Sequence, residues 1–464
     1  MVNPLPDRFT EAHALLRKHF GFPGFRPAQR RVLQSVLLGR DTLAVLPTGG
    51  GKSLCFQIPA LMLSGLTIVV SPLIALMQDQ VAAGRSKGIP AAALNSTMKA
   101  AEQRSVMKGV IEGHIRLLYL APERLPRVVE ELRQHAVRCD LLAVDEAHCI
   151  SEWGHDFRPS YRRLRQRRAR LGFPQVLALT GSATPAVRRD ILASLGMPDA
   201  AVHVASFDRP NIWFGVARPK SEPHRLALLK QALRAETSMT LVYAPTRSLC
   251  EALSKEINRA GILARPFHAG LTVEERQETL ERFLTDRVST VVATSAFGMG
   301  IDKPDVRVVV HWSLPATPEA YYQEAGRGGR DGEPARAVML YRRGDAEFHR
   351  MQLGVTFPPR RVLEVIWSGR TTGIPDNVIE SAHRLARELR PEHGPVDWGP
   401  VKRRLRAARH RLATIERYAS AKRCRRRALV GYFREALGRC SGCDRCRCRP
   451  SQCAEAGVQE AHGL

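Results

Sequence analysis

Short apolar runs alternate with longer stretches of helical periodicity through residues 41–345, and this alternation constrains the fold more than any other feature. Such a strand–helix rhythm is typical of parallel sheets covered by helices. Proline interrupts it near Phe207–Asn211, so we predict two α/β domains of similar design, one on each side. The expected strands are Thr42–Leu46, Leu66–Val70, Arg116–Tyr119, Leu141–Val144, Val176–Leu179, Thr240–Tyr243, Thr290–Ala293, Val306–His311 and Ala337–Tyr341.

The pattern changes after Gly344, where prolines separate helical pieces. Helices are predicted at Val362–Ser368, Asn377–Leu389 and Trp398–Arg417. The chain is expected to divide into two α/β domains, a helical linker, a cysteine-rich segment and a frayed tail. Their predicted bounds are 1–206, 207–345, 346–423, 424–453 and 454–464.

Basic residues outnumber acidic ones strongly, with 71 Lys and Arg against 45 Asp and Glu, a net charge of +26. Residues 401–450 hold 17 of the basic residues and three acids. A genome biased toward arginine would raise the total, but this concentration favours a polyanionic partner. No run of about 18 apolar residues predicts a membrane span, and the start lacks a secretory core. We therefore expect a cytoplasmic protein, associated with the nucleoid if bacterial.

A glycine-rich turn follows the first predicted strand and leads into a helix through Lys52 and Ser53. Backbone amides in such a turn bind phosphate oxygens, and the helix N-terminus adds partial positive charge. Lys52 is expected to reach the outer phosphates of a nucleotide and Ser53 to bind Mg²⁺. Leu46 stands where the strict motif has its first glycine, so a chance glycine turn is the alternative. The other residues of this cradle are Thr48, Gly49, Gly50 and Gly51.

Asp145 and Glu146 end another apolar strand, and an acid there faces the phosphate cradle in this architecture. We expect Asp145 to bind Mg²⁺ and Glu146 to orient or deprotonate the attacking water. Arg327 and Arg330 lie in a glycine-flanked segment of the second half. Arginines delivered by a second domain stabilise transferred charge and contribute about 10³–10⁵ in rate. The pattern predicts nucleoside triphosphate hydrolysis coupled to domain movement.

These motifs, in this order, resemble the RecQ family of superfamily 2 DNA helicases from about Phe20 to Cys446, more weakly over 346–422. The resemblance implies two tandem RecA-like domains and a small helical zinc-binding subdomain. It also implies that Phe22, Arg26 and Gln29, within Phe20–Gln29, contact adenine. Further residues carry roles by resemblance: Gln323 in catalysis, Asp302 in nucleotide binding, and Asn95, Ser96 and His268 in DNA binding.

Directly after the sequence Asp145–His148, a DEAH motif, the segment Ser151–Arg158 is similar to the aromatic-rich loop of RecQ-like helicases. Trp153 and Phe157 offer faces on which unpaired bases stack, worth about 1–3 kcal/mol per base. By resemblance His155 and Arg158 join them as DNA contacts. Core packing of Trp153 is the alternative.

Six of the ten cysteines lie between Cys424 and Cys453. Four of them, with the spacing C-x15-C-x2-C-x2-C, suit a tetrahedral thiolate zinc site, and their surroundings resemble the RecQ zinc-binding subdomain. These predicted ligands are Cys424, Cys440, Cys443 and Cys446. Cys448 and Cys453 are surplus thiols or competing ligands.

The leading hypothesis is an ATP-dependent DNA helicase that moves 3′ to 5′ on single-stranded DNA in repair or recombination, with ATP, Mg²⁺ and Zn²⁺ as cofactors. Forked or tailed DNA is the expected substrate, single-strand-binding and recombination proteins are candidate partners, and a monomer is favoured. The chain is expected to lack the winged-helix and C-terminal domains of longer relatives, and its predicted helices between 354 and 420 form either a DNA-binding insert or a helical spacer. An ATP-switched translocase or strand-annealing protein is therefore the alternative. An RNA-remodelling ATPase is a third, which the Trp153 loop disfavours.

Overall fold

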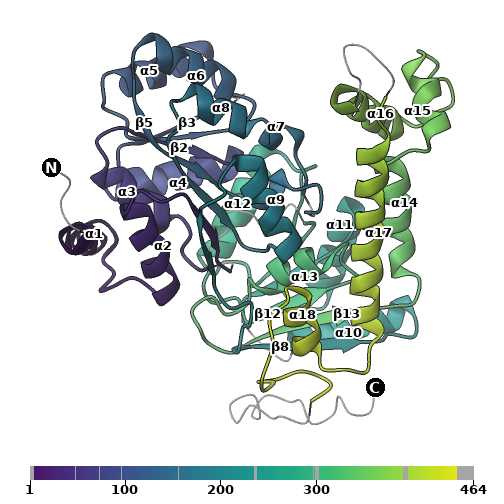
Figure 1. The fold of residues 1–464 in the computed structure, drawn as a ribbon. Helices are drawn as coiled ribbons and strands as arrows, with labels where there is room; N and C mark the ends of the chain where they lie inside the picture. The colour runs from purple at the N-terminus through teal and green to yellow at the C-terminus, as the bar shows by residue number, and fades with distance from the viewer. Residues whose placement is uncertain are drawn as a thin grey trace. The chain divides into compact units, whose positions relative to one another are not determined.

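The computed structural model describes residues 5–47, 49–72, 74–95, 97–154, 156–234, 238–295, 297, 303–389 and 396–446. The chain forms two compact units, which divide between Phe207 and Asp208. Each unit is built on its own parallel sheet with helices on both faces (Figure 1). The prediction of two α/β domains with parallel sheets, followed by a helical region with a four-cysteine site, is confirmed.

The first unit has a seven-stranded sheet with the order β3-β4-β2-β5-β6-β1-β7, and all its strand pairs are parallel. The central strand β5 has four consecutive side chains with no exposed surface, Leu141 to Val144, because helices cover both faces. The strands are β1 Thr42–Val45, β2 Leu66–Val70, β3 Ala91–Leu94, β4 Leu117–Leu120, β5 Cys139–Val144, β6 Gln175–Thr180 and β7 Ala201–Val204. The helices are α1 Leu5–Phe20, α2 Pro27–Leu37, α3 Leu54–Met62, α4 Ile74–Ser86, α5 Ala100–Ile111, α6 Leu125–Gln134, the 3-10 helix η1 Ala147–Ile150, α7 Pro159–Arg162, α8 Leu164–Arg170 and α9 Pro185–Leu195.

The second unit has a six-stranded parallel sheet with the order β10-β11-β9-β12-β13-β8. Its strands are β8 Ile212–Ala217, β9 Thr240–Tyr243, β10 Ala264–Phe267, β11 Thr290–Ala293, β12 Val308–His311 and β13 Ala335–Leu340. The helices that pack on this sheet are α10 Glu222–Arg234, α11 Arg247–Arg259, α12 Val273–Leu284 and α13 Pro318–Ala325.

Five further helices complete the second unit: α14 Asp345–Thr356, α15 Arg360–Trp367, α16 Asp376–Leu389, α17 Gly399–Ser420 and α18 Arg425–Tyr432. Helices α14 and α17 lie side by side, and α15 and α16 lie at the end of α17 remote from α18 (Figure 1). A small apolar core joins α15, α16 and the start of α17, where the rings of Trp367 and Trp398 stack 5.3 Å apart. The three predicted helices of this region are therefore present.

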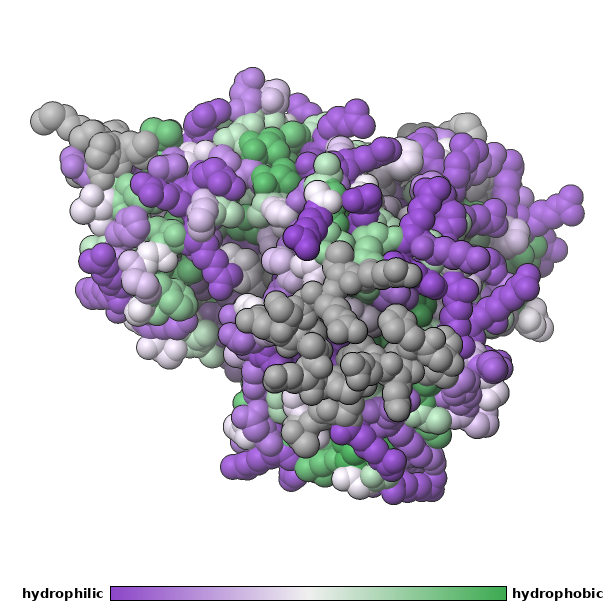
Figure 2. All heavy atoms as spheres, turned by 90° about the horizontal axis from the view of Figure 1, so that it is seen from below, coloured by the Kyte–Doolittle hydropathy of each residue, from purple (hydrophilic) through white to green (hydrophobic). Residues whose placement is uncertain are grey.

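The segment after α18 returns to the sheet, where the Asp444 amide donates to the Phe214 carbonyl of β8 at 3.0 Å. It therefore packs on the second unit as part of the same body. Within the described residues, no helix is both long and apolar enough to cross a membrane. Figure 2 shows a mainly hydrophilic surface on the side where α14 and α17 lie.

All nine predicted strands are present, three of them (β2, β9 and β11) with the predicted bounds. Sequence reading missed four others. Strand β3 is alanine-rich, β7 is a partly exposed edge strand, β10 contains Pro266, and β8 contains Gly215. Alanine, proline and glycine are depleted in strands, so these segments give weak local signals although β8 is mainly apolar. Their pairing comes from the sheets around them.

Candidate nucleotide site and zinc centre

The glycine-rich turn after β1 has the tight backbone that a phosphate cradle requires. Gly51 has a φ of +69°, and a Cβ atom there would lie 2.2 Å from Nε2 of Gln29. At Gly50 a Cβ atom would lie 2.8 Å from the Pro47 carbonyl oxygen. Helix α3 then begins at Leu54 with Ser53 as its N-cap. A side chain at either position would therefore collide, with the Gln29 amide at Gly51 and with the Pro47 carbonyl at Gly50.

Two of the residues assigned to adenine hold this turn from α2. Nε2 of the buried Gln29 donates to the carbonyls of Gly50 and Gly51, each at 3.2 Å, and Oε1 accepts from the Arg26 amide at 2.9 Å. The Arg26 guanidinium donates to the Gly49 carbonyl. Phe22 is half exposed, with 50% of its surface accessible. Two residues predicted to contact adenine thus hold the glycine turn that is predicted to bind phosphate.

Asp145 lies directly beyond β5, where its amide donates to the Val70 carbonyl at 2.9 Å. Burial, and then the neighbouring Glu146 carboxylate, raise the pKa of Asp145 to about 6, while the positive charge of Lys52 opposes the rise. Lys52 and Asp145 therefore lie within electrostatic reach although 93 positions separate them in the chain. This is the edge where ligands bind to parallel sheets, beyond the carboxyl ends of the strands.

Glu146 has a left-handed backbone with φ 45° and ψ 47°, a conformation that is uncommon outside glycine and concentrated at functional sites. Oε2 of Glu146 lies 3.1 Å from Nδ1 of the buried His148, and the same ring nitrogen lies 2.9 Å from Oγ1 of Thr180. Burial lowers the pKa of His148, but the adjacent Cys149 and Glu146 outweigh this effect and leave the pKa above its usual value.

The Glu146–His148–Thr180 contacts connect the strand-end acids to the end of β6. Thr180 also accepts from the Ser182 amide at 3.4 Å, and Thr184 caps α9 by accepting from the Val187 amide. Sequence reading quoted His148 within the DEAH sequence but gave it no role, and it did not single out Thr180. The position of Thr180 at a strand end, two residues before Ser182, is the signal that could have found it.

The Trp153 loop is anchored at both ends and exposes its aromatic side chain. Oγ of Ser151 donates to Asp190 at 2.7 Å, and the Arg158 guanidinium donates to the Pro72 carbonyl at 2.9 Å. Trp153 is 46% exposed, which excludes the core-packing alternative. Phe157 is half buried beneath the guanidinium of Arg162, 5.9 Å from the ring centroid. The loop is thus fixed at both ends, while the Trp153 ring is accessible for stacking.

In the second unit, Arg327 and Arg330 lie in the tight loop that follows α13. Arg327 is buried, with 6% of its surface exposed, and Arg330 is half buried. Burial raises the pKa of Tyr243, at the end of β9, to about 12, and the charges of both arginines oppose that rise. Both arginines therefore lie near the carboxyl edge of the second sheet. Gly329, at φ +55°, leaves no room for a side chain, since a Cβ atom would lie 2.4 Å from Nδ2 of Asn211.

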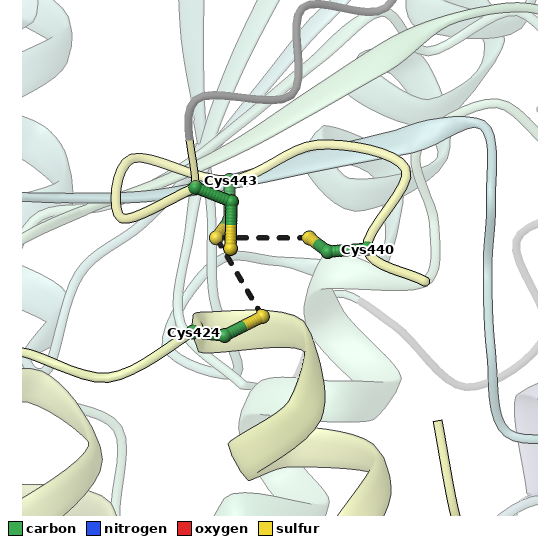
Figure 3. Close-up of side chains that lie close together, drawn as sticks. Cys424, Cys440 and Cys443 are labelled. Atoms are coloured by element: carbon green, nitrogen blue, oxygen red, sulfur yellow. Dashed lines mark hydrogen bonds between the residues drawn. The ribbon is translucent and has the colours of Figure 1, made fainter. Parts of the chain in front are cut away.

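The sulfur atoms of Cys424, Cys440, Cys443 and Cys446 all lie within 4.8 Å of one another. Sγ of Cys443 lies 3.8 Å from Sγ of Cys440 and 3.9 Å from Sγ of Cys424, and the three point toward a common centre (Figure 3). Four thiolates at a Zn–S distance of about 2.3 Å in a tetrahedron are about 3.8 Å apart. The sulfur geometry therefore fits zinc, and four protein ligands leave no open coordination position.

Other predicted residues have different environments. Asn95 is buried, and its Oδ1 accepts from the amide and hydroxyl of Thr97 at 2.9 and 2.7 Å. His268 is buried with Nε2 3.2 Å from the Glu251 carboxylate. Gln323 is half buried on α13. The predictions for Thr48, Ser96, His155, Asp302, Cys448, Cys453 and the tail 454–464 lie outside the described residues.

Residues 26–191 match the DEAD/DEAH box helicase family, residues 224–332 the helicase conserved C-terminal domain, and residues 389–447 the RecQ zinc-binding family. The chain is 42% identical over 342 residues to the probable ATP-dependent DNA helicase RecS of Bacillus subtilis, covering 73% of this chain and 68% of that protein. It is 37% identical over 441 residues to the ATP-dependent DNA helicase RecQ of Pasteurella multocida, covering 94% of this chain and 62% of that one.

Among solved structures, the Mycobacterium smegmatis helicase Lhr bound to single-stranded DNA and AMP-PNP superposes with a TM-score of 0.57. The alignment covers 87% of this chain and 57% of that one at 22% identity, so it supports the fold alone. The chain spans 62% and 68% of the lengths of the two relatives above. With three helicase and zinc-binding matches in the expected order, and the four sulfur atoms in place, this chain belongs to the RecQ family of DEAD/DEAH-box helicases.

Proposed function

We propose that this protein is an ATP-dependent DNA helicase that moves 3′ to 5′ along single-stranded DNA and separates duplexes in repair or recombination. The observation that carries the proposal is the glycine turn after β1, which shares the carboxyl edge of the first sheet with Asp145 at the end of β5. The two sequence relatives are both named as DNA helicases, which supports the same activity.

Hydrolysis would begin with the triphosphate in the turn formed by residues 47–53. Lys52 offsets charge on the outer phosphates, while Gln29 and Arg26 contact the base and Phe22 stacks on it. Glu146, held 3.1 Å from His148, accepts a proton from the attacking water. Ser53 and Asp145 would hold Mg²⁺, which supplies charge neutralisation at the phosphates when bound.

The second unit would contribute Arg327 and Arg330 when the two units close on the nucleotide. Positive charge delivered to the transferred phosphoryl group lowers the barrier only in the closed state. Closure and reopening would then change the grip on the strand once per ATP. Trp153, which is exposed on an anchored loop that begins five residues after Glu146, would stack on unpaired bases and report strand occupancy to the hydrolytic residues.

Tailed duplexes test the proposal directly. Purified full-length protein is mixed with duplexes that carry a 3′ or a 5′ single-stranded tail, and ATP hydrolysis and strand release are followed together. We expect DNA-stimulated hydrolysis and release from the 3′-tailed duplex alone. Lys52→Ala and Asp145→Asn should abolish hydrolysis while strand binding remains nearly intact.

The same assay separates the alternatives. Annealing of strands without ATP-dependent release would favour the translocase or annealing protein. Hydrolysis stimulated by RNA but not by single-stranded DNA would favour an RNA-remodelling ATPase. Normal turnover in either variant would refute the site assignment.

A further inference from the structure

We propose that Arg209 positions the arginine-bearing loop Gly326–Arg330, and that Arg426, in the zinc-binding segment, holds Arg209 in place. Neither arginine was singled out by sequence, and neither belongs to the hydrolytic site described above. The inference rests on the proposed function, because Arg327 and Arg330 would serve ATP hydrolysis.

Arg209 binds the loop through three carbonyl groups. Nη1 donates to the Gly326 carbonyl at 2.9 Å, and Nη2 donates to the carbonyls of Gly328 and Gly329 at 2.9 and 3.0 Å. These acceptors lie on both sides of Arg327 and at the C-terminal end of α13, where a helix carries partial negative charge that favours a cation. One rigid guanidinium fork therefore fixes the backbone on both sides of a proposed catalytic arginine.

The loop depends on such outside contacts because glycine supplies three of its five residues. Glycine leaves the backbone more freedom than any other residue, so the loop has little stiffness of its own. Asn211 adds a second donor, with Nδ2 at 2.8 Å from the carbonyls of Gly329 and Glu333. The Gly329 and Arg330 amides are also bound, to the Val306 and Pro304 carbonyls at 2.8 and 3.0 Å.

Arg426 holds the segment from which Arg209 and Asn211 project. Its side chain is 1% exposed, and Nη1 donates to Oδ1 of Asp208 and to the Arg209 carbonyl, both at 2.6 Å. Nη2 donates to the Ile212 carbonyl, and the guanidinium lies 5.5 Å from the ring centroid of Phe214. A buried guanidinium with several acceptors fixes that backbone tightly, because removing it would leave those acceptors unsatisfied.

The zinc-binding segment also contacts α13, the helix that leads into the same loop. The Tyr432 hydroxyl donates to the Glu319 carboxylate at 2.6 Å, and the rings of Phe433 and Tyr322 lie 5.0 Å apart. Arg426 lies two residues after the zinc ligand Cys424. The segment therefore contacts both α13 and the backbone that holds the loop beyond its end. We infer that it stabilises the position of the proposed catalytic arginines.

The test compares Arg209→Lys and Arg426→Lys with Arg225→Lys in the 464-residue chain. Arg225 is the control, because it is a buried arginine of the same unit whose Nη2 donates to the two Asp345 carboxylate oxygens at 2.7 and 2.9 Å, outside the zinc-binding segment. Hydrogen–deuterium exchange of peptides covering residues 325–333 reports loop order without any requirement for activity. Steady-state ATP hydrolysis with saturating single-stranded DNA gives kcat and KM.

We expect Arg209→Lys and Arg426→Lys to raise exchange in 325–333 by about tenfold or more, and Arg225→Lys by less than about twofold. The first two variants should lower kcat by about 10–100-fold, the effect of a misplacement near 1 Å, with KM for ATP changed less than about threefold because the phosphate cradle lies in the other unit.

Unchanged exchange in both Arg209→Lys and Arg426→Lys would refute the proposal that these arginines hold the loop Gly326–Arg330. An equal rise in all three variants would refute it too. Faster exchange with a normal kcat would overturn the positioning role. Arg209 is only half buried, so its lysine variant keeps the test decisive if Arg426→Lys does not fold. If the unaltered protein shows no DNA-stimulated hydrolysis, the proposed function fails. The exchange comparison still decides whether Arg209 and Arg426 hold the loop in place.

Discussion

The ion pair between Arg425 and Asp444 fastens the zinc-binding segment to the second sheet, and Asp444→Asn should loosen it strongly. Arg425 has no exposed surface, and its Nε and Nη2 donate to the two Asp444 carboxylate oxygens at 2.9 and 3.3 Å. The Val216 amide donates to the same carboxylate at 3.3 Å. Asparagine removes the negative charge, so the buried Arg425 guanidinium loses its counterion. Its side-chain NH₂ group would also face the N–H donors of Arg425 and Val216, which it cannot accept from.

Removing one partner of a buried pair costs about 3–5 kcal/mol, which corresponds to a rise of about 10²–10³·⁵ in the equilibrium for opening the segment. The assay is the rate at which excess chromogenic chelator captures zinc from the folded protein. We expect capture to be faster by about a hundredfold or more. Glu364→Gln is the control, because its pair with Arg360 is exposed and is worth about 0–1 kcal/mol.

A double-mutant cycle with Arg425→Gln separates the pair from general damage. If the pair carries the effect, Arg425→Gln with Asp444→Asn should destabilise the segment by less than the sum of the two single effects, with a coupling of about 1–3 kcal/mol. Additive effects, or a change below about fivefold in Asp444→Asn, would refute the reasoning.

Three further predictions concern binding. Gln29→Ala should weaken ATP binding by about 1–2 kcal/mol, or about 5–30-fold, by removing two hydrogen bonds to the glycine turn along with the proposed base contact. Equal titrations of a fluorescent ATP analogue in both proteins would contradict this. Trp153→Ala should weaken single-stranded DNA binding by about 1–3 kcal/mol in fluorescence anisotropy, whereas Phe173→Ala, at an exposed ring on another loop, should not. Arg406 and Arg409 lie on the exposed face of α17, and a variant with both changed to Gln should bind DNA with a weaker salt dependence. The slope of log affinity against log salt should fall by about 1 for each DNA phosphate that the variant no longer neutralises. An unchanged slope would exclude that face as a DNA contact.

The parts of the fold that sequence predicted are those in which local pattern and burial coincide. Strand β5 could be read from four consecutive apolar residues, and Asp145 could be assigned because parallel strands end at a common edge. The cysteine spacing likewise carried the zinc site without help from the fold. Asn95 and His268, in contrast, were assigned by motif, and the structure buries both.

Arg209 shows why the rest could not be read from sequence. Its acceptors lie 117 to 120 residues away in the chain, and nothing local distinguishes it from the many surface arginines. His148 was visible in its motif, but its contact with Thr180 joins two strand ends that only the sheet order brings together. Long-range polar contacts of this kind depend on topology, which no periodicity in the sequence reports.

The basic residues concentrated in 401–450 have two different roles. Arg404, Arg411, Arg425 and Arg426 are buried, and the last two direct their donors to carboxylates and main-chain carbonyls. A guanidinium suits this role because five donors in a planar fork can satisfy several carbonyls at once. Exposed positions such as Lys402, Arg406 and Arg409 remain for phosphate contacts. Net charge alone therefore overstates the nucleic-acid surface of this segment, and burial decides which arginines stabilise the fold and which are available to a polyanion.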